Sequence, residues 1–210
     1  MIGECLVDVS LKSDNDELIE SVTSKTFFVT DNIEVLFSLN KKTLLPGEKL
    51  ILSGEIKPSF EDEIKNAKLN VKIDDIPVAI EFKGLKFNYE TTLSKIIKSG
   101  EHNIEINLND SFGNNGNKKE GFYVTPVPKK LELNLNNTNF KPEEIVEIKP
   151  LLYDQAGDLI AESLLIKVYN PQKEVFSGES VDGIQFTIPK HSIPGIYKIN
   201  YSVYIVAISH

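Results

Sequence analysis

The alternation of hydrophobic and polar residues along this chain is typical of β-strands. In four segments every second residue is apolar, as in a strand with one face in a core and the other in water. These segments are residues 69–73, 104–108, 131–135 and 165–169. Turn-forming sequences such as Leu45-Pro46-Gly47 and Ile193-Pro194-Gly195 punctuate the chain between such segments. Short strands separated by turns in this way predict an all-β sandwich or barrel.

A related sequence pattern occurs three times along the chain. Each copy opens with a glycine followed by a strand-like segment, at Gly3, Gly100 and Gly195. An aromatic segment, Phe27-Phe28-Val29-Thr30, recurs 95 residues later as Phe122-Tyr123-Val124-Thr125. This period is too long for a helical solenoid or a propeller blade, and it is close to the roughly 100 residues of one immunoglobulin-type sandwich. The pattern therefore predicts tandem immunoglobulin-like β-sandwiches.

The repeat divides the chain into three parts. Residues 1–31 match only the last two strands of a preceding repeat, and residues 32–125 form one whole sandwich. Residues 126–210 form a second sandwich that is expected to lack its last strand. The whole sandwich is predicted to have seven strands, at residues 36–39, 49–56, 68–73, 78–82, 87–93, 101–109 and 119–124. Residues 126–128, Pro-Val-Pro, form a short linker that is expected to be stiff and extended.

Composition narrows the possible partners. The net charge is −8 and the chain has no arginine, which argues against nucleic acid or an anionic membrane surface. A single cysteine cannot form an internal disulfide. Neither a signal peptide nor an apolar run of about 20 residues is present in the sequence. An exported parent protein would therefore carry its export signal outside this chain.

The sequence offers little that resembles an active site. One equivalent position, two residues after each repeat glycine, holds three different residue types, and these are Cys5, His102 and Tyr197. Such variety indicates a structural slot rather than a catalytic residue, and Tyr197 resembles the tyrosine corner of immunoglobulin-like sandwiches. The chain lacks a G-x-S-x-G sequence and has only three histidines, so neither a nucleophile elbow nor a zinc site is predicted. We therefore predict no catalytic residue and no resident cofactor.

The acidic loops of the chain suggest calcium as a possible ligand. The candidate oxygen donors are Asp14, Asp16, Asp110 and Asn114. Calcium takes six to eight oxygens, and the EF-hand spacing is not met. The segment 110–114 is also explained as a turn in which Asp, Asn and Gly supply local hydrogen bonds and a positive φ. We therefore expect these acidic loops to be solvated and not to bind calcium.

Two groups of residues carry a resemblance to known families. Leu45-Pro46-Gly47-Glu48-Lys49-Leu50 resembles the strand-opening sequence of prokaryotic, including archaeal, surface immunoglobulin-like repeats. Ile193-Pro194-Gly195-Ile196-Tyr197 is similar to the closing strand of macroglobulin-type modules. The resemblance implies extracellular, non-catalytic modules of adhesins or envelope proteins. The thioester sequence G-C-G-E-Q of complement-like macroglobulins is absent from this chain, so thioester chemistry is not implied.

These observations favour a structural or adhesive spacer of an exported cell-surface protein, with other domains of the same array as its partners. One alternative is an envelope protein that assembles head to tail by strand complementation, with itself as the partner. A second alternative is an accessory domain that binds a surface glycan or protein through exposed aromatic residues. The aromatic candidates for that surface are Phe60, Tyr89, Phe112 and Phe176.

Overall fold

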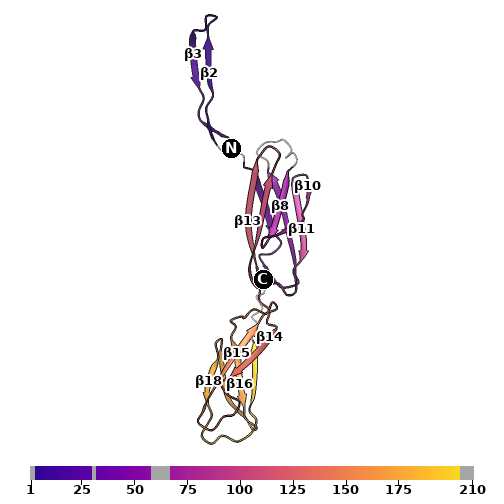
Figure 1. Ribbon diagram of the computed structural model, residues 1–210, viewed down its shortest axis with the longest axis vertical. Coiled ribbons are helices and arrows are strands. Elements are labelled where there is room, and N and C mark those ends of the chain that lie inside the picture. The colour runs from indigo at the N-terminus through magenta and orange to yellow at the C-terminus, as the bar shows by residue number, and fades with distance from the viewer. Residues whose placement is uncertain (1–2, 30–31, 58–66, 204–210) are drawn as a thin grey trace. The chain divides into compact units, whose positions relative to one another are not determined.

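A computed structural model describes residues 3–29, 32–57 and 67–203, and every regular element in these ranges is a β-strand (Figure 1). The all-β prediction is confirmed. Within these ranges there is accordingly no helix of the length and apolarity needed to cross a membrane. The chain divides into two compact units, which are described separately. One comprises Met1–Lys42, Lys49–Thr91 and Glu101–Phe122, and the other comprises Thr43–Glu48, Thr92–Gly100 and Tyr123–His210.

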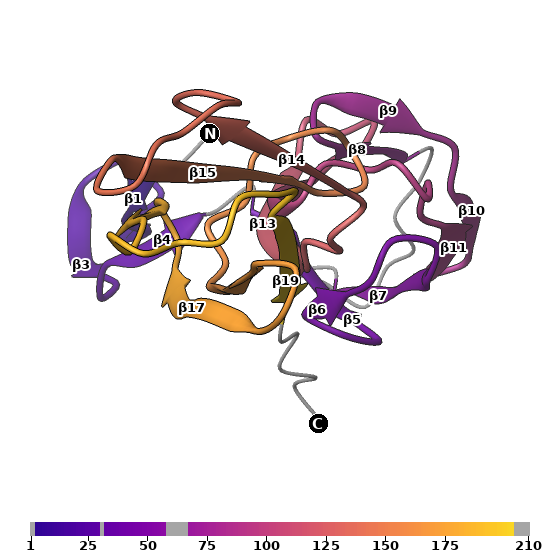
Figure 2. The same cartoon turned by 90° about the horizontal axis from the view of Figure 1, so that it is seen from below.

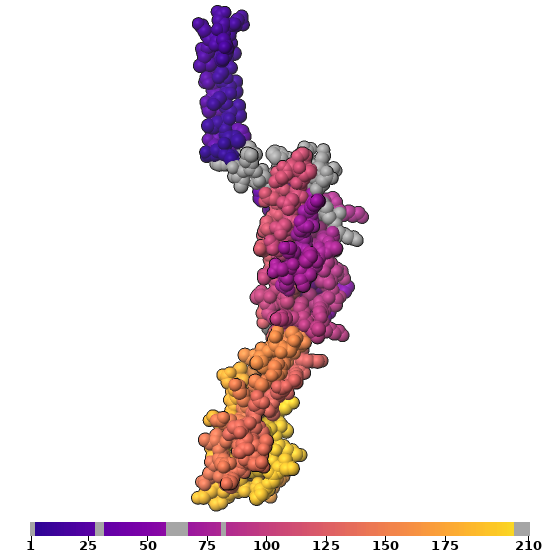
Figure 3. Space-filling model, viewed as in Figure 1, coloured from indigo at the N-terminus to yellow at the C-terminus, as the bar shows by residue number. Residues whose placement is uncertain are grey.

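Residues 3–29 form a two-stranded antiparallel ribbon. Its strands are β1 (Gly3–Cys5), β2 (Asp8–Lys12), β3 (Leu18–Thr23) and β4 (Phe27–Val29). β1 pairs with β4, and β2 pairs with β3. All residues of β2 and β3 are exposed, and their atoms belong to the indigo part of the chain in Figure 3. The ribbon therefore presents apolar side chains, such as Val9 and Val22, to solvent.

Within the described residues, nine strands form the first sandwich. They are β5 (Glu34–Leu39), β6 (Thr43–Leu44), β7 (Lys49–Lys57), β8 (Lys68–Ile73), β9 (Ile76–Val78), β10 (Glu81–Lys83), β11 (Lys86–Thr92), β12 (Gly100–Asn109) and β13 (Asn115–Val124). One sheet has the order β10-β11-β7-β5 and the other β6-β13-β12-β8-β9. Lettered in chain order, with the short β6 and β9 as A′ and C′, these sheets read D-E-B-A and A′-G-F-C-C′. This is the strand order of an immunoglobulin-like sandwich.

The core of the first sandwich follows from the alternation in its strands. On β7 the inward positions include Leu50, Leu52 and Ile56, which are all 0% exposed. The inward position between Leu52 and Ile56 is Gly54, and the ring of Phe87 from β11 fills the space beside it. Facing them on β12 are Ile104, Ile106 and Leu108, also 0% exposed. Burial of these aliphatic side chains supplies the main favourable free energy of folding.

For the first sandwich, one strand prediction was wrong and one strand was not predicted. Residues 78–82, predicted as one strand, belong to two strands in different sheets, because the chain crosses between sheets after β9. β9 pairs with β8, whereas β10 pairs with β11. The two-residue strand β6 was not predicted, since it is too short to show alternation. The other predicted strands of this sandwich are present, with ends that differ by up to four residues.

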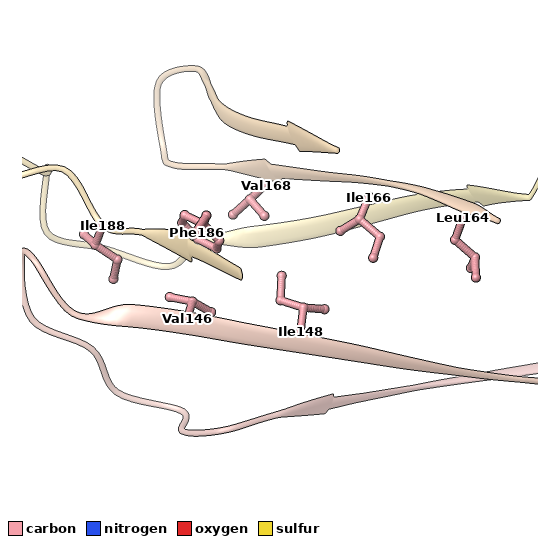
Figure 4. Packing of buried hydrophobic residues seen from close by; sticks show 7 residues of the cluster. All are labelled: Val146, Ile148, Leu164, Ile166, Val168, Phe186 and Ile188. Atoms are coloured by element: carbon pink, nitrogen blue, oxygen red, sulfur yellow. The ribbon is translucent and has the colours of Figure 1, made fainter. Parts of the chain in front are cut away.

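The part of the second sandwich that the structure describes has six strands. They are β14 (Lys130–Leu135), β15 (Ile145–Tyr153), β16 (Leu164–Tyr169), β17 (Glu174–Ser180), β18 (Ile184–Thr187) and β19 (Lys198–Val203). The sheets have the orders β14-β15-β18 and β17-β16-β19, and Figure 2 shows β14 and β15 in one layer with β17 and β19 in the other. Val146 and Ile148 of β15 point toward Ile166 and Val168 of β16 to form the core (Figure 4). Residues 204–210, the continuation of the predicted penultimate strand, lie outside the described residues.

We predict that Gly54→Ala destabilises the first sandwich by about 1–3 kcal/mol, because a Cβ at this position overpacks the core. The added atom would lie 2.1 Å from the nearest carbon of the buried Phe87 ring. The control is Gly3→Ala, where no heavy atom lies within 4 Å of the added Cβ. Urea unfolding measures both free energies, and equal values for the two variants would contradict the packing account.

Candidate functional site

The three slot residues occupy the same position in the sequence repeat, and two of them are placed opposite an aromatic residue. His102 of β12 stacks on Phe122 of β13, with 5.0 Å between ring centroids and 15° between ring planes. Cys5 of β1 has Phe27 of β4 as its register partner. Because Phe27 and Phe122 occupy equivalent positions in the repeat, the slot residue lies opposite a phenylalanine of another strand in both cases.

His102 is held in one orientation by a carboxylate. Its Nδ1 lies 2.5 Å from Oδ2 of Asp74, and the other Asp74 oxygen accepts the Asn103 N–H at 2.9 Å. The His102 residue is 6% exposed, and Phe122 covers one face of its ring. This is the environment of a packed core residue rather than of a group that meets a substrate, because catalysis requires the ring to reach the reacting atoms.

Tyr197 lies just before β19 in a different environment. Its hydroxyl donates a long hydrogen bond of 3.4 Å to the carbonyl oxygen of Ile193, as in a tyrosine corner. Among the described residues, β19 pairs with β16 on one side and with no strand on the other. A cavity of about 490 Å³ adjoins Tyr197. Its lining is mainly apolar and comes from both sheets, and includes Phe140, Val146, Val168, Phe186, Tyr197 and Ile199.

The inward-facing residues of β12 and β19 differ strongly in exposure. On β12, Ile104, Ile106 and Leu108 are 0% exposed. Their repeat counterparts on β19 are Ile199, Tyr201 and Val203. Tyr201 is 49% exposed, and the other two are only partly buried. In the first sandwich β13 lies beside β12, so the difference coincides with the presence of a neighbouring strand.

Two of the calcium candidates, Asp110 and Asn114, form a turn between β12 and β13. Asp110 Oδ1 accepts the N–H groups of Phe112 and Asn114 at 2.8 and 2.9 Å, and Oδ2 accepts the Asn114 side-chain amide at 2.8 Å. Burial acts to raise the pKa of Asp110, but these hydrogen bonds outweigh it and lower the pKa below 3.8. Both carboxylate oxygens of Asp110 thus already accept hydrogen bonds from N–H groups.

The other two calcium candidates lie in the exposed turn between β2 and β3. Asp16 Oδ1 is 3.1 Å from Nζ of Lys12, and its side chain is 84% exposed. Asp14 is also exposed. The described residues contain no group of three or more His, Cys, Asp or Glu side chains placed to hold a metal ion. The structure therefore brings the four candidates together only in pairs.

Asp154 was missed by the sequence reasoning. It is 2% exposed, and its Oδ1 accepts the N–H groups of Ala156 and Asp158 at 2.8 and 2.9 Å. Its Oδ2 accepts the Ser99 hydroxyl within the same compact unit. Burial acts to raise the pKa of Asp154, but the hydrogen bonds lower it overall. The detectable signal was that residues 154–158 repeat the Asp-x-x-Gly-Asn/Asp spacing of residues 110–114.

The aromatic candidates for a glycan surface lie in unlike environments. Phe112 is 73% exposed, whereas Phe176 stacks on Phe186 with 5.2 Å between centroids. Tyr89 is partly buried, and Phe60 lies outside the described residues. A stacking platform for a glycan needs several exposed rings on one face. Phe112 is strongly exposed, but Phe176 and Tyr89 are not.

Comparison with known proteins adds little beyond this geometry. No family model and no curated protein matches the sequence. Among solved structures, native Escherichia coli alpha-2-macroglobulin has a TM-score of 0.36 and 14% identity over 96% of this chain and 16% of that chain. A putative membrane anchored protein from Corynebacterium diphtheriae has a TM-score of 0.35 and 13% identity, over 90% and 57%.

The D1–D4 ectodomain fragment of ICAM-5 has a TM-score of 0.37 and 14% identity, over 96% of this chain and 55% of that chain. The chain thus spans 13–20% of the bacterial macroglobulins and little more than half of the other two proteins. Likenesses of this size carry no argument about function. The immunoglobulin-like assignment therefore depends on the strand order of the sheets.

We predict that Asp110→Ala lowers the free energy of unfolding by about 1–2 kcal/mol at neutral pH, because N–H donors in the turn lose their acceptor. Asp14→Ala, at an exposed position, is the control. Since the pKa of folded Asp110 is lowered, its contribution is present above pH 3.8 and is lost as the pH falls through the lowered value. Urea unfolding across pH measures this difference, which should shrink in acid.

The same experiment tests calcium. Because the Asp110 oxygens accept hydrogen bonds, added calcium should leave the unfolding midpoint of the unsubstituted chain unchanged. A midpoint that rises with calcium, and that no longer rises in Asp110→Ala, would overturn this account of the turn.

Proposed function

We propose that the chain is a non-catalytic structural module of an exported cell-surface protein, in which immunoglobulin-type sandwiches transmit tension between other domains of the same array. The polar groups described above support this proposal, because their contacts maintain turns and core packing. The acidic surface, with a net charge of −8, fits an extracellular spacer that stays soluble and avoids nucleic acid.

The observation that carries the proposal is the parallel pairing of the last strand of the first sandwich, β13, with the short strand β6 near the beginning of that sandwich. β13 pairs parallel with β6, with Tyr123 opposite Thr43 and Val124 opposite Leu44. Next to this pairing, the Thr125 N–H donates to the Leu44 carbonyl oxygen at 2.9 Å.

A second parallel contact lies at the beginning of β13. Asn115 forms a parallel bridge with Asn32, and the Ile33 N–H donates to the Asn115 carbonyl oxygen at 2.7 Å. The segment that leads into the sandwich therefore accompanies β13 at both ends of that strand.

This arrangement determines how the sandwich responds to a pull on its two ends. The segment entering the sandwich is pulled backward while β13 is pulled forward, so two parallel strands must slide past each other. The hydrogen bonds of these parallel strands run across the strands, so the pull loads them together. In a hairpin that is pulled at its open end, by contrast, the hydrogen bonds open one after another. A module built in this way resists extension, which is the property a spacer under tension needs.

Single-molecule force spectroscopy tests the mechanical role. The first sandwich should unfold in one step at a distinct force, with a gain in contour length of about 30 nm for roughly 94 released residues. Thr125→Pro should lower that force, because proline removes the N–H that bonds Leu44. Thr125→Ala keeps the N–H and is the matched control.

Extension without a force peak would contradict the proposal, and so would an equal peak in the Thr125→Pro and Thr125→Ala proteins. The extracellular assignment is checked separately by labelling the parent protein with antibody on intact and on permeabilised cells. Signal confined to permeabilised cells would refute it.

A further inference from the structure

A row of alternating charges crosses the outer face of one sheet of the first sandwich. In that sheet β12 lies between β8 and β13. Glu105 of β12 has Lys72 of β8 as its register partner, and its Oε1 lies 3.4 Å from Nζ of Lys119 on β13. The neighbours of Glu105 along β12, Ile104 and Ile106, are 0% exposed and face the core, so Glu105 itself points away from the core. The row therefore places one carboxylate between two lysines on the outside of the sheet.

A cavity of about 410 Å³ adjoins this row. Cavities that bind small molecules have volumes of about 300–1,000 Å³. Apart from Ile104, the lining residues are polar or charged, and they are Lys72, Asp74, Asp75, Asn103, Glu105 and Lys119. We propose that this cavity binds an uncharged saccharide unit of a glycan, through hydrogen bonds to the hydroxyl groups of the sugar.

The lining suits a sugar because it offers hydrogen-bond donors and acceptors side by side. A hydroxyl group donates one hydrogen bond and can accept two. Neighbouring hydroxyls of a sugar ring can therefore accept from the Lys119 ammonium group and donate to the Glu105 carboxylate. The ion pair between these two side chains leaves capacity for both bonds, because an ammonium group has three donors and a carboxylate has about four acceptor sites. The exposed side chain of Asn103 adds an amide that can both donate and accept.

The carboxylate of Asp74 is held in position before a ligand arrives. Its Oδ2 lies 2.5 Å from Nδ1 of His102, and its Oδ1 accepts the Asn103 N–H at 2.9 Å. The Asp74 side chain is nevertheless 41% exposed, so its remaining lone pairs can be reached from the cavity. A group that is already fixed loses little rotational freedom when a ligand binds, which favours affinity.

The carboxylate of Glu105 is held in a similar way. Its Oε1 accepts the side-chain amide of Asn107 at 3.2 Å. This hydrogen bond, together with Lys119 and Lys72, lowers the pKa of Glu105, although burial acts to raise it. Glu105 is therefore an ionised acceptor at neutral pH.

The polar surface continues along the strands beyond the cavity. Asn107 lies two residues after Glu105 on β12, hence on the same face, and its register partner on β8 is Asn70. From the other side, Nδ2 of Asn117 on β13 donates to Oδ1 of Asn107 at 2.5 Å. A row of amides thus lies next to the charged row and can bind a second sugar unit of an oligosaccharide.

The lining argues against other classes of ligand. The lining residues that the structure describes include no arginine, methionine or aromatic residue, and these are the types enriched at protein interfaces. Lysine, glutamate and aspartate, which are depleted at such interfaces, make up most of the lining. The carboxylates outnumber the lysines, which disfavours an anionic ligand such as phosphate. An uncharged sugar meets neither objection.

The turn between β8 and β9 allows binding to be separated from folding. Asp74 and Asp75 have φ angles of 49° and 64°, in the left-handed region. Two-residue hairpin turns with positive φ at both positions favour glycine at the second. Glycine in place of Asp75 would therefore suit the turn, but it would remove a carboxylate from the cavity. We expect Asp75→Gly to keep the fold and to weaken sugar binding.

A glycan array tests whether the chain binds sugars. The whole chain carries a biotinylated tag at one end and is presented on streptavidin, so that several weak contacts act together. The array holds neutral and acidic oligosaccharides, and we expect retention on neutral ones. The inference is overturned if no neutral oligosaccharide retains the chain, or if acidic ones alone do.

Isothermal titration with the best-retained neutral oligosaccharide then tests the site. Glu105→Gln and Asp75→Gly should each raise the Kd about tenfold or more, since each loses a charged acceptor. The matched control is Glu90→Gln, because Glu90 pairs with Lys49 on the other sheet, at 2.5 Å. Urea unfolding should show the Asp75→Gly protein to be no less stable than the unsubstituted chain. Equal Kd values for Glu105→Gln and Glu90→Gln would reject this site.

This inference is independent of the mechanical proposal. A chain that unfolds at a distinct force but binds no sugar would remain a spacer without a glycan site. A chain that binds a neutral oligosaccharide through Glu105 but extends without a force peak would be a binding module that bears no load.

Discussion

The packing of Phe122 on His102 is the contact on which closure of the first sandwich depends. It joins the last strand, β13, to its neighbour β12 and buries both rings. With β13 in place, the inward aliphatic residues of β12 are excluded from water. The same strand also forms parallel pairings with residues 32–33 and 43–44. One strand thus completes the hydrophobic core and connects the two ends of the module.

In the second sandwich, β19 has a strand neighbour on the β16 side only, among the residues that the structure describes. Its central core is well formed, because Ile148, Leu164 and Ile166 are at most 1% exposed. Burial declines toward β19, where Tyr201 is half exposed, and toward the cavity beside Tyr197. Among the described strands of the second sandwich, the inward side chains are thus least protected from water at β19.

The acidic residues have a different role from the one that their spacing first suggests. Asp110 was a candidate oxygen donor for calcium, and the residues after Asp154 repeat the spacing found after Asp110. In the fold, their oxygens instead accept N–H groups of their own turns. A carboxylate satisfied in this way stabilises a tight turn and holds its charge to lower pH. Turns of this kind connect strands without bringing several carboxylates together.

Much of the fold could be predicted from the sequence because strand periodicity is a local property. Alternation identified strands such as β8 and β16, and the repeat glycines marked the equivalence of Cys5, His102 and Tyr197. The short strand β6 and the crossing between β9 and β10 could not be predicted, since both depend on which sheet each segment joins. The stacking of His102 on Phe122 also required the fold, because it joins residues 20 positions apart.

Burial of Asp154 was missed for a related reason. Aspartate is usually exposed, and only the tertiary arrangement shows that three donors enclose this one. The cavity beside Tyr197 was likewise invisible in the sequence, because it is formed by segments from both sheets. The alternation of apolar and polar residues thus predicted the strands, whereas the contacts between the sheets became visible only in the three-dimensional structure.

Amide hydrogen exchange shows directly whether a neighbouring strand closes the edge of a sheet. Amides on both edges of β12 should be protected, because β8 and β13 flank that strand. In β19, whose one strand neighbour among the described residues is β16, the amides directed toward β16 should be protected and the alternate set should exchange quickly. Equal protection of both sets in β19 and in β12 would show that a neighbouring strand is not what closes the edge.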